Sequence, residues 1–274
     1  MAGKWGVLFR ANQLRSCCHT LLQCNITLVR CSIKAHISAA STAGGSIKLF
    51  DKLHRAHGAF VNLDSDALKR SAVRLSTLRA FGSNPGELIG RLYVPNSLLD
   101  GAPLVVVLHG CTQTSEAYAR GVGWIKAADD HGFVVLLPEQ KRANNPNLCF
   151  NWFSPRDARR GRGEALSIAQ MVKAVQEMHH TDRARVFVTG LSAGGAMAAV
   201  MLPTYPEIFA GGAIVAGLPF GTANNVPQAL ERMRGHDIPE GRRLGDLARS
   251  ASSHSGPWPS LSVWHGTNDT TVSC

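Results

Sequence analysis

The chain has 274 residues, of which 45% are hydrophobic and 18% charged, a composition typical of a globular protein with one large or two small domains. Its net charge of +10 lies in one part of the chain, because residues 1–80 hold 12 Lys and Arg against three Asp and Glu, whereas residues 81–274 hold 17 against 16. No recognised nucleic-acid-binding module accompanies this charge, so composition argues against a nucleic-acid partner.

Residues 1–72 are interpreted as a basic, poorly defined N-terminal extension. The first 50 residues contain no Asp or Glu, and the apolar stretch Leu21–Val29 is interrupted by polar residues at 23, 25 and 27. This pattern does not match a secretory signal, and no run of 18 apolar residues predicts a transmembrane segment. In composition the extension resembles an organelle transit peptide, although a misassigned start codon or a disordered extension explains it equally well.

Predicted elements begin at residue 73. Turn formers at 82–86 separate two β-prone stretches, which predicts an opening hairpin. Continuous apolar runs then predict strands buried on both faces, and apolar residues at helical spacing predict helices between them. The predicted strands are Val73–Ala80, Glu87–Val94, Leu104–Leu108, Phe133–Leu137, Arg185–Thr189, Gly211–Val215 and Leu261–Trp264, and the predicted helices are Glu116–Asp130, Gly163–Met178, one directly after Ser192, and Val226–Arg234. This alternation predicts one α/β domain over residues 73–274 with a doubly wound, mostly parallel sheet.

Ser192 lies in the pattern Gly-x-Ser-x-Gly, between a predicted strand and a predicted helix. That is the layout of a nucleophile elbow. A sharp strand-to-helix turn holds the serine in a strained backbone conformation, so small residues are needed at 190 and 194, where neighbouring backbone packs close. The helix N-terminus behind the turn favours negative charge, so Ser192 is the candidate nucleophile of an acyl-transfer reaction.

Acyl transfer through a serine also needs backbone donors for the oxyanion, and an acid that orients a histidine base. The sequence His109-Gly-Cys111 follows a predicted strand, at the place where α/β-hydrolases supply one oxyanion donor. We expect the N–H groups of Cys111 and Ala193 to be the two donors. Asp269 is the candidate acid, because it follows the last predicted strand and the order Ser then Asp matches that fold. His265 precedes the acid and is interpreted as a structural loop histidine.

Two cysteines and two acidic residues are given structural interpretations. Cys111 and Cys149 either pair in an oxidising compartment or stay buried as free thiols. The total of seven cysteines does not indicate a disulfide framework, and their spacing matches no zinc site. Glu164 and Asp157 are interpreted as residues that form salt bridges or anchor loops.

Seven segments from about residue 78 onward resemble the poly(3-hydroxybutyrate) depolymerase family of esterases, which includes relatives acting on feruloyl and acetyl esters of plant polysaccharides. They are Phe81-Gly-Ser-Asn-Pro-Gly86, Val107-Leu-His-Gly-Cys-Thr-Gln113, Cys149-Phe-Asn-Trp-Phe153, Arg160-Gly-Arg-Gly-Glu164, Val188-Thr-Gly-Leu-Ser-Ala-Gly-Gly195, Ala216-Gly-Leu-Pro219 and Val263-Trp-His-Gly-Thr-Asn-Asp269. The resemblance implies an α/β-hydrolase fold and ester hydrolysis through an acyl-enzyme, without a metal or an organic cofactor. It implies Ser192 as the nucleophile and Asp269 as the acid.

The resemblance also bears on the substrate cleft and on localisation. It implies that Trp152 and Phe153 line the ester cleft, although plain core packing explains both aromatic residues equally well. Family members are often exported, so the resemblance implies an extracellular protein, with the cytoplasm as the alternative.

The sequence departs from the family pattern after Asp269. The family's base is a histidine some tens of residues beyond the acid, whereas five residues follow Asp269 here and none is a histidine. We therefore expect a C-terminally truncated esterase that lacks the last strand and helix of the sheet and has impaired turnover. The Leu261–Trp264 strand would then be an open sheet edge.

The leading hypothesis is thus a serine esterase acting on polyhydroxyalkanoate-type or other short-chain esters. A feruloyl or acetylxylan esterase is the alternative enzyme, and a serine peptidase on the same fold is disfavoured because no propeller or cap domain is evident. Two hypotheses come from other classes: a non-catalytic α/β-hydrolase remnant acting as a binding module, and nucleic-acid binding through the basic N-terminus.

Overall fold

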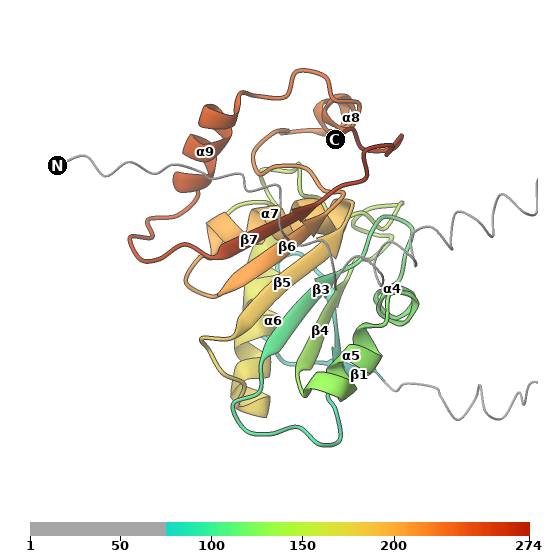
Figure 1. Ribbon diagram of the computed structural model, residues 1–274, viewed down its shortest axis with the longest axis vertical. Helices are drawn as coiled ribbons and strands as arrows, with labels where there is room; N and C mark the ends of the chain where they lie inside the picture. The colour runs from blue at the N-terminus through green and yellow to red at the C-terminus, as the bar shows by residue number, and fades with distance from the viewer. Residues whose placement is uncertain (1–74) are drawn as a thin grey trace, which may run out of the picture. The chain divides into compact units, whose positions relative to one another are not determined.

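A seven-stranded β-sheet forms the centre of residues 75–274, the part of the chain that this computed structural model describes. The predicted N-terminal extension, residues 1–72, lies outside the described residues. The strands are β1 (Ser76–Leu78), β2 (Ile89–Tyr93), β3 (Leu104–Leu108), β4 (Val134–Glu139), β5 (Val186–Leu191), β6 (Gly211–Val215) and β7 (Ser260–Trp264). Their order is β1-β2-β4-β3-β5-β6-β7; β2 pairs antiparallel with β1 and β4, and all other pairs are parallel. The run from β4 through β3, β5 and β6 to β7 can be followed in Figure 1.

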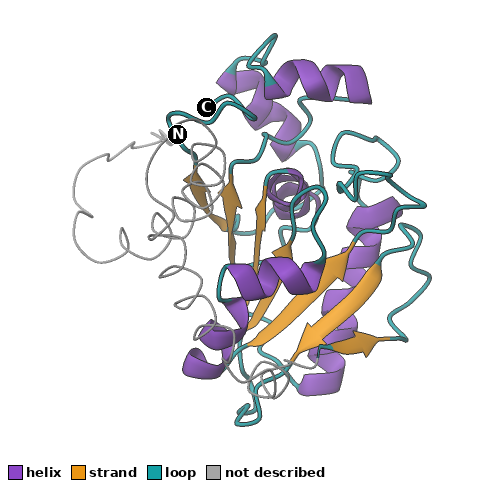
Figure 2. Ribbon diagram, turned by 90° about the vertical axis from the view of Figure 1, so that its right-hand side faces the viewer, coloured by secondary structure: helices purple, strands orange, loops and turns teal. Residues whose placement is uncertain are grey.

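Helices cover both faces of this sheet (Figure 2). The helices of the described residues are α4 (Ser115–Gly121), α5 (Trp124–His131), α6 (Gly163–His179), α7 (Ala193–Thr204), α8 (Val226–Met233) and α9 (Gly241–Arg249). Along β3, Leu104, Val106 and Leu108 pack in a core with α6 and α7, whereas Val107 packs in a second core with α4 and α5. Because successive side chains enter opposite cores, a continuous apolar run is required. The predicted doubly wound α/β sheet is confirmed.

Two stretches differ from the predicted elements. The predicted helix Glu116–Asp130 is two helices, α4 and α5, because Gly123 between them has a φ of 81°, which interrupts right-handed helical geometry. The sequence pattern predicts no helix at α9, where leucines at 244 and 247 stand among charged residues and no residue is buried. None of the described helices has both the length and the apolar character of a membrane span.

The loops that follow β3, β5, β6 and β7 meet at one edge of the sheet, since these four strands are parallel. They carry the candidate oxyanion loop, Ser192, residues 216–218 and the segment with Asp269. In Figure 1, α8 lies beyond this edge. The fold therefore gathers the residues singled out in the sequence at the carboxyl edge of the sheet.

Candidate active site

Ser192 occupies the sharp turn between β5 and α7, with a φ of 55° and a ψ of −118°. A residue with a side chain is strained at such angles, as in a nucleophile elbow. The Ser192 N–H donates to the Val215 carbonyl at 2.9 Å, and the Ser192 carbonyl accepts from the Ala196 N–H at 2.8 Å. The strained turn is therefore fixed both by the neighbouring strand and by its own helix.

The elbow leaves no room for side chains at the two flanking glycines. A Cβ on Gly194 would overlap the Leu108 carbonyl at the end of β3, and a Cβ on Gly190 would overlap the backbone of Gly194. These neighbours are backbone atoms, which cannot rotate away as the end of a flexible side chain can. Glycine at both positions thus lets α7 begin against β3 and β5.

The loop after β3 presents Cys111 to the same cavity as the elbow. The Thr112 N–H donates to the Asn147 carbonyl at 2.7 Å, which fixes the loop, while the Cys111 N–H has no acceptor among the loop hydrogen bonds of the described residues. Ala193 is the first residue of α7, where a helix offers its N–H no internal acceptor. Cys111 and Ala193 both line the cavity that contains Ser192.

A disulfide joins Cys111 to Cys149, which answers the question that the sequence leaves open. It ties the loop after β3 to the segment that leads into Trp152, and both cysteines line the Ser192 cavity. The position of the Cys111 N–H therefore depends on a covalent link between two of the cavity walls.

Replacing both Cys111 and Cys149 with serine is expected to lower the free energy of unfolding by about 4 kcal/mol, because the bridge closes a loop with a sequence separation of 38. Denaturant unfolding without reductant measures this loss. Cys274→Ser is the matched control, since Cys274 is free and exposed, and it should leave stability unchanged. A double variant as stable as the parent chain would contradict the expectation.

His109 is buried, and both of its ring nitrogens have partners. Nε2 accepts from the Gln140 N–H at 3.2 Å, so the proton belongs to Nδ1, which lies 2.8 Å from the Gly110 carbonyl. Burial lowers the pKa of His109, which keeps the ring neutral. His109 therefore holds the loop after β3 and has no free nitrogen to accept a proton from Ser192.

Asp269 lies in the loop after β7, at the sheet edge that also carries Ser192. Its Oδ1 accepts from the N–H groups of Thr271 and Val272 at 2.8 and 3.1 Å, and its Oδ2 lies 3.8 Å from His265 Nε2. His265 Nε2 also lies 2.9 Å from the Val272 carbonyl. Val272 lines the Ser192 cavity, whereas Asp269 does not. The carboxylate and the histidine are thus engaged within their own loop.

A cavity of about 270 Å³ opens at Ser192. Five of the six residues that the sequence analysis singles out lie in its lining, namely Ser192, Cys111, Ala193, Trp152 and Phe153. Trp152 is 7% exposed and belongs to the core, and its ring meets that of Phe153 edge to face at 5.6 Å between centroids. The two aromatic residues therefore pack in the core and also form a cavity wall. No histidine is among the lining residues in the described part of the chain.

The apolar face of α8 is a part of the lining that the sequence analysis missed. Val226, Ala229, Leu230 and Met233 recur at helical spacing, and all four line the Ser192 cavity. Val226 and Leu230 are 53% and 46% exposed, because the cavity opens to solvent. The spacing is visible in the sequence, but it does not reveal whether the face covers a core or a cavity.

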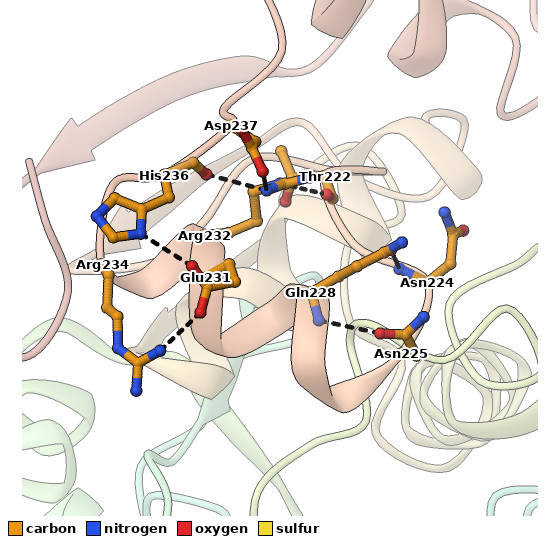
Figure 3. A network of polar contacts seen from close by, with 9 residues as sticks. All are labelled: Thr222, Asn224, Asn225, Gln228, Glu231, Arg232, Arg234, His236 and Asp237. Carbon is orange, nitrogen blue, oxygen red and sulfur yellow. Dashed lines mark hydrogen bonds and ion pairs between the residues drawn. The ribbon is translucent and has the colours of Figure 1, made fainter.

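A polar network fixes α8 over the site (Figure 3). At the start of the helix, Asn225 Oδ1 accepts from the Gln228 N–H at 2.9 Å. Near its end, Arg232 Nε donates to the Thr222 carbonyl at 3.0 Å. Both ends of α8 are thus tied to the segment that precedes it, which keeps the apolar face towards the Ser192 cavity.

Glu164 is buried and anchors the segment that carries the aromatic wall. Its carboxylate accepts from the Asn151 N–H at 2.8 Å, from Asn151 Nδ2 at 2.7 Å and from Gln140 Nε2 at 2.6 Å. Burial raises the pKa of Glu164 to about 7, although these three donors each act to lower it. The contacts agree with a loop-anchoring role, because Asn151 directly precedes Trp152.

The protein is expected to lose stability as pH rises from about 4.5 to about 7, through Glu164. In the unfolded chain Glu164 ionises near pH 4.5, whereas in the folded chain it keeps its proton until about pH 7. Ionisation between these pH values therefore favours unfolding, and the free energy of unfolding falls by on the order of 3 kcal/mol in total. Glu164→Gln removes this titration, so the stability difference between variant and parent should change with pH by that amount. Denaturant unfolding at several pH values measures it. Glu177→Gln, at an exposed position, should give a curve parallel to the parent; a parallel curve for Glu164→Gln would contradict the expectation.

Comparison with known proteins gives consistent matches in sequence and structure. The family model described as Esterase PHB depolymerase matches residues 88–274. Poly(3-hydroxyalkanoate) depolymerase C of Paucimonas lemoignei is 47% identical over 74% of this chain, which spans about half (49%) of that protein. A probable acetylxylan esterase A of Aspergillus clavatus is 34% identical, over 76% of this chain and 69% of the relative. The solved acetyl xylan esterase from Aspergillus awamori aligns with a TM-score of 0.69 and 29% identity, over 73% of this chain and 74% of that one, and the predicted α/β-hydrolase fold is confirmed.

Proposed function

Since the chain belongs to the esterase family of PHB depolymerases, we propose that it hydrolyses carboxylic esters with Ser192 as the nucleophile. The Ser192 hydroxyl attacks the ester carbonyl, the alcohol leaves with a proton, and water then releases the acid from the acyl-enzyme. The N–H groups of Cys111 and Ala193 stabilise the oxyanion in both steps. The observation that carries the proposal is a strained serine in a cavity that Cys111 and Ala193 also line, two residues whose N–H groups have no acceptor among residues 75–274.

Asp269 is the proposed acid, whose role is to orient a histidine base. Within the described residues no histidine lines the Ser192 cavity, and both His109 and His265 are engaged elsewhere. We therefore expect this chain to hydrolyse esters slowly. A site with oxyanion donors and a bound substrate but no base retains roughly 10³ to 10⁴-fold acceleration over water.

A polyhydroxyalkanoate-type or other short-chain ester is the proposed substrate. The apolar face of α8 and the rings of Trp152 and Phe153 form apolar walls, which suit a short aliphatic acyl group. The similarity to a poly(3-hydroxyalkanoate) depolymerase supports the same substrate class. Acetyl esters of xylan are the second candidate, because relatives named acetylxylan esterase match both in sequence and in structure.

The release of p-nitrophenol from its butyrate and acetate esters tests the substrate class. We expect a larger rate constant for butyrate, because two further methylenes are buried against α8. Leu230→Ser should reduce this preference by about tenfold, because two buried methylenes at roughly 0.8 kcal/mol each contribute about 1.6 kcal/mol. Leu261→Ser, at an exposed position on β7 that is outside the cavity lining, is the control and should keep the preference. A preference for acetate in the parent chain would favour the acetyl esterase instead.

The domain over residues 73–274 is proposed to work in an oxidising compartment, such as the extracellular space. The Cys111–Cys149 disulfide supports this placement, because structural disulfides persist there and thiols stay reduced in the cytoplasm. Residues 1–72 are proposed to be an extension that lies outside this domain.

A further inference from the structure

A second cavity, of about 760 Å³, adjoins the Ser192 cavity. Trp152 and Phe153 line both cavities, so their rings form a shared wall. One side of the second cavity consists of residues 152–162, and the other side consists of residues 220–224 with parts of α8 and α9. Helix α8 also lines both cavities, with Gln228 and Arg232 on the second cavity and Ala229 and Met233 on the Ser192 cavity.

The second cavity, called here the arginine cavity, has a strongly positive lining. Its charged residues are Arg159, Arg160, Arg162, Arg232, Arg243 and Asp237. Arg160 is neutralised by Glu207, with two hydrogen bonds of 2.6 and 3.0 Å, and Arg232 lies 3.5 Å from Asp237. The other three arginines form no ion pair with any residue in the described part of the chain.

The paired arginines hold the walls of the arginine cavity. Arg160 Nη1 donates to the Thr204 carbonyl at 2.7 Å, and the guanidinium lies 4.8 Å from the centroid of the Tyr205 ring. Arg232 has a side chain that is only 14% exposed and holds Thr222, as Figure 3 shows. By contrast, Arg159, Arg162 and Arg243 are exposed, so their guanidinium groups are available to an anion.

We propose that the arginine cavity binds a free carboxylate of the substrate while an ester bond of the same molecule lies at Ser192. The inference rests on the proposed function and names its substrate more closely. A guanidinium group presents parallel N–H donors that match the two oxygens of a carboxylate. An ester oligomer of a hydroxy acid has such a carboxylate at one end, and every hydrolysed ester bond creates a new one. The interior of a long polyester lacks this group, so the cavity selects short oligomers with an acidic end.

Calorimetric titration of the Ser192→Ala chain at low salt tests this binding without turnover. The ligands are the linear trimer of 3-hydroxybutyrate as its free acid and as its terminal carboxamide, which differ in one charge. We expect the free acid to bind about tenfold more tightly, with most of this difference lost in 0.5 M NaCl because exposed charges are screened. Replacing Arg159, Arg162 and Arg243 together with glutamine should bring the two affinities to within about twofold.

The matched control replaces Arg156, Arg183 and Arg242 with glutamine. These three arginines are exposed and line neither cavity, so the control removes the same net charge. It should keep the preference for the free acid. Equal affinities for acid and amide in the parent, or an equal loss in the control, would overturn the inference. The second pair of ligands is a xylo-oligosaccharide with a glucuronate and the same oligosaccharide without it. A preference for the carboxylate that is seen only in this second pair would also overturn the inference.

Butyryl transfer from p-nitrophenyl butyrate to Ser192 separates this inference from the proposed function. The ester is neutral and carries no carboxylate, so its reaction in the parent chain tests Ser192 without the arginine cavity. If Ser192 reacts and the trimer acid shows no advantage, the carboxylate inference fails alone. If the acid is preferred and Ser192 never reacts, the proposed function fails.

Discussion

The rate at which Ser192 is acylated by p-nitrophenyl butyrate is expected to rise about tenfold per pH unit between pH 7 and pH 9. A serine with a histidine partner reaches a plateau once the imidazole is neutral, near pH 7. Within the described residues no histidine lines the Ser192 cavity, so hydroxide must remove the proton and the rate follows its concentration. Release of p-nitrophenol, corrected for spontaneous hydrolysis, measures the rate.

Two variants test whether this pH profile arises from Ser192. Ser192→Ala should remove the pH-dependent release, and Ser262→Ala, a change to an exposed serine on β7, should leave it unchanged. A plateau near pH 7 in the parent chain would contradict the account, because it would show that a histidine already serves Ser192. In that case Asp269 and the loop after β7 would need a different arrangement from the one described.

Gly194→Ala is expected to destabilise the fold by about 3 kcal/mol, at the upper end of the cost of overpacking. The added methyl group would overlap the Leu108 carbonyl at the end of β3, and neither backbone can move without separating α7 from the sheet. Ser192 and Ala193 move with that helix, so acylation should also fall by at least about a hundredfold. Denaturant unfolding and the p-nitrophenol assay measure the two effects.

Gly241→Ala is the matched control for this substitution. Gly241 is exposed at the start of α9, and a Cβ there meets no atom within 4 Å. The substitution should leave activity unchanged, and it should stabilise the protein by up to about 1 kcal/mol because alanine has less conformational freedom in the unfolded chain. If Gly194→Ala left stability and acylation as unchanged as Gly241→Ala does, this would contradict the close packing of α7 against β3 at Gly194.

The parts of the site that the sequence predicts are those set by local chain geometry. The strand before Ser192, its flanking glycines and the helix behind it are adjacent in sequence, so their pattern predicts the elbow directly. The apolar run of β3 likewise predicts a buried strand and the loop that holds Cys111. Gly123 is an exception, because helical periodicity continues past a residue that breaks the helix.

The rest depends on how distant segments pack. Cys111 and Cys149 become neighbours only when the loop after β3 meets the segment before Trp152, so their pairing cannot be read from spacing. The apolar face of α8 has the same spacing as a core helix, and only its position shows that it lines a cavity. The arginine cavity joins residues 152–162 to α9, which are about 80 residues apart in the chain.

Peptide mapping by mass spectrometry after reaction with p-nitrophenyl butyrate identifies the residue that carries the acyl group. We expect one butyryl group per chain, attached to Ser192, which accumulates because water is poorly activated in the next step. The Ser192→Ala chain should carry none. A butyryl group on another residue, or an unmodified Ser192 at pH 9 where acylation should be fast, would contradict the assignment of Ser192 as the nucleophile.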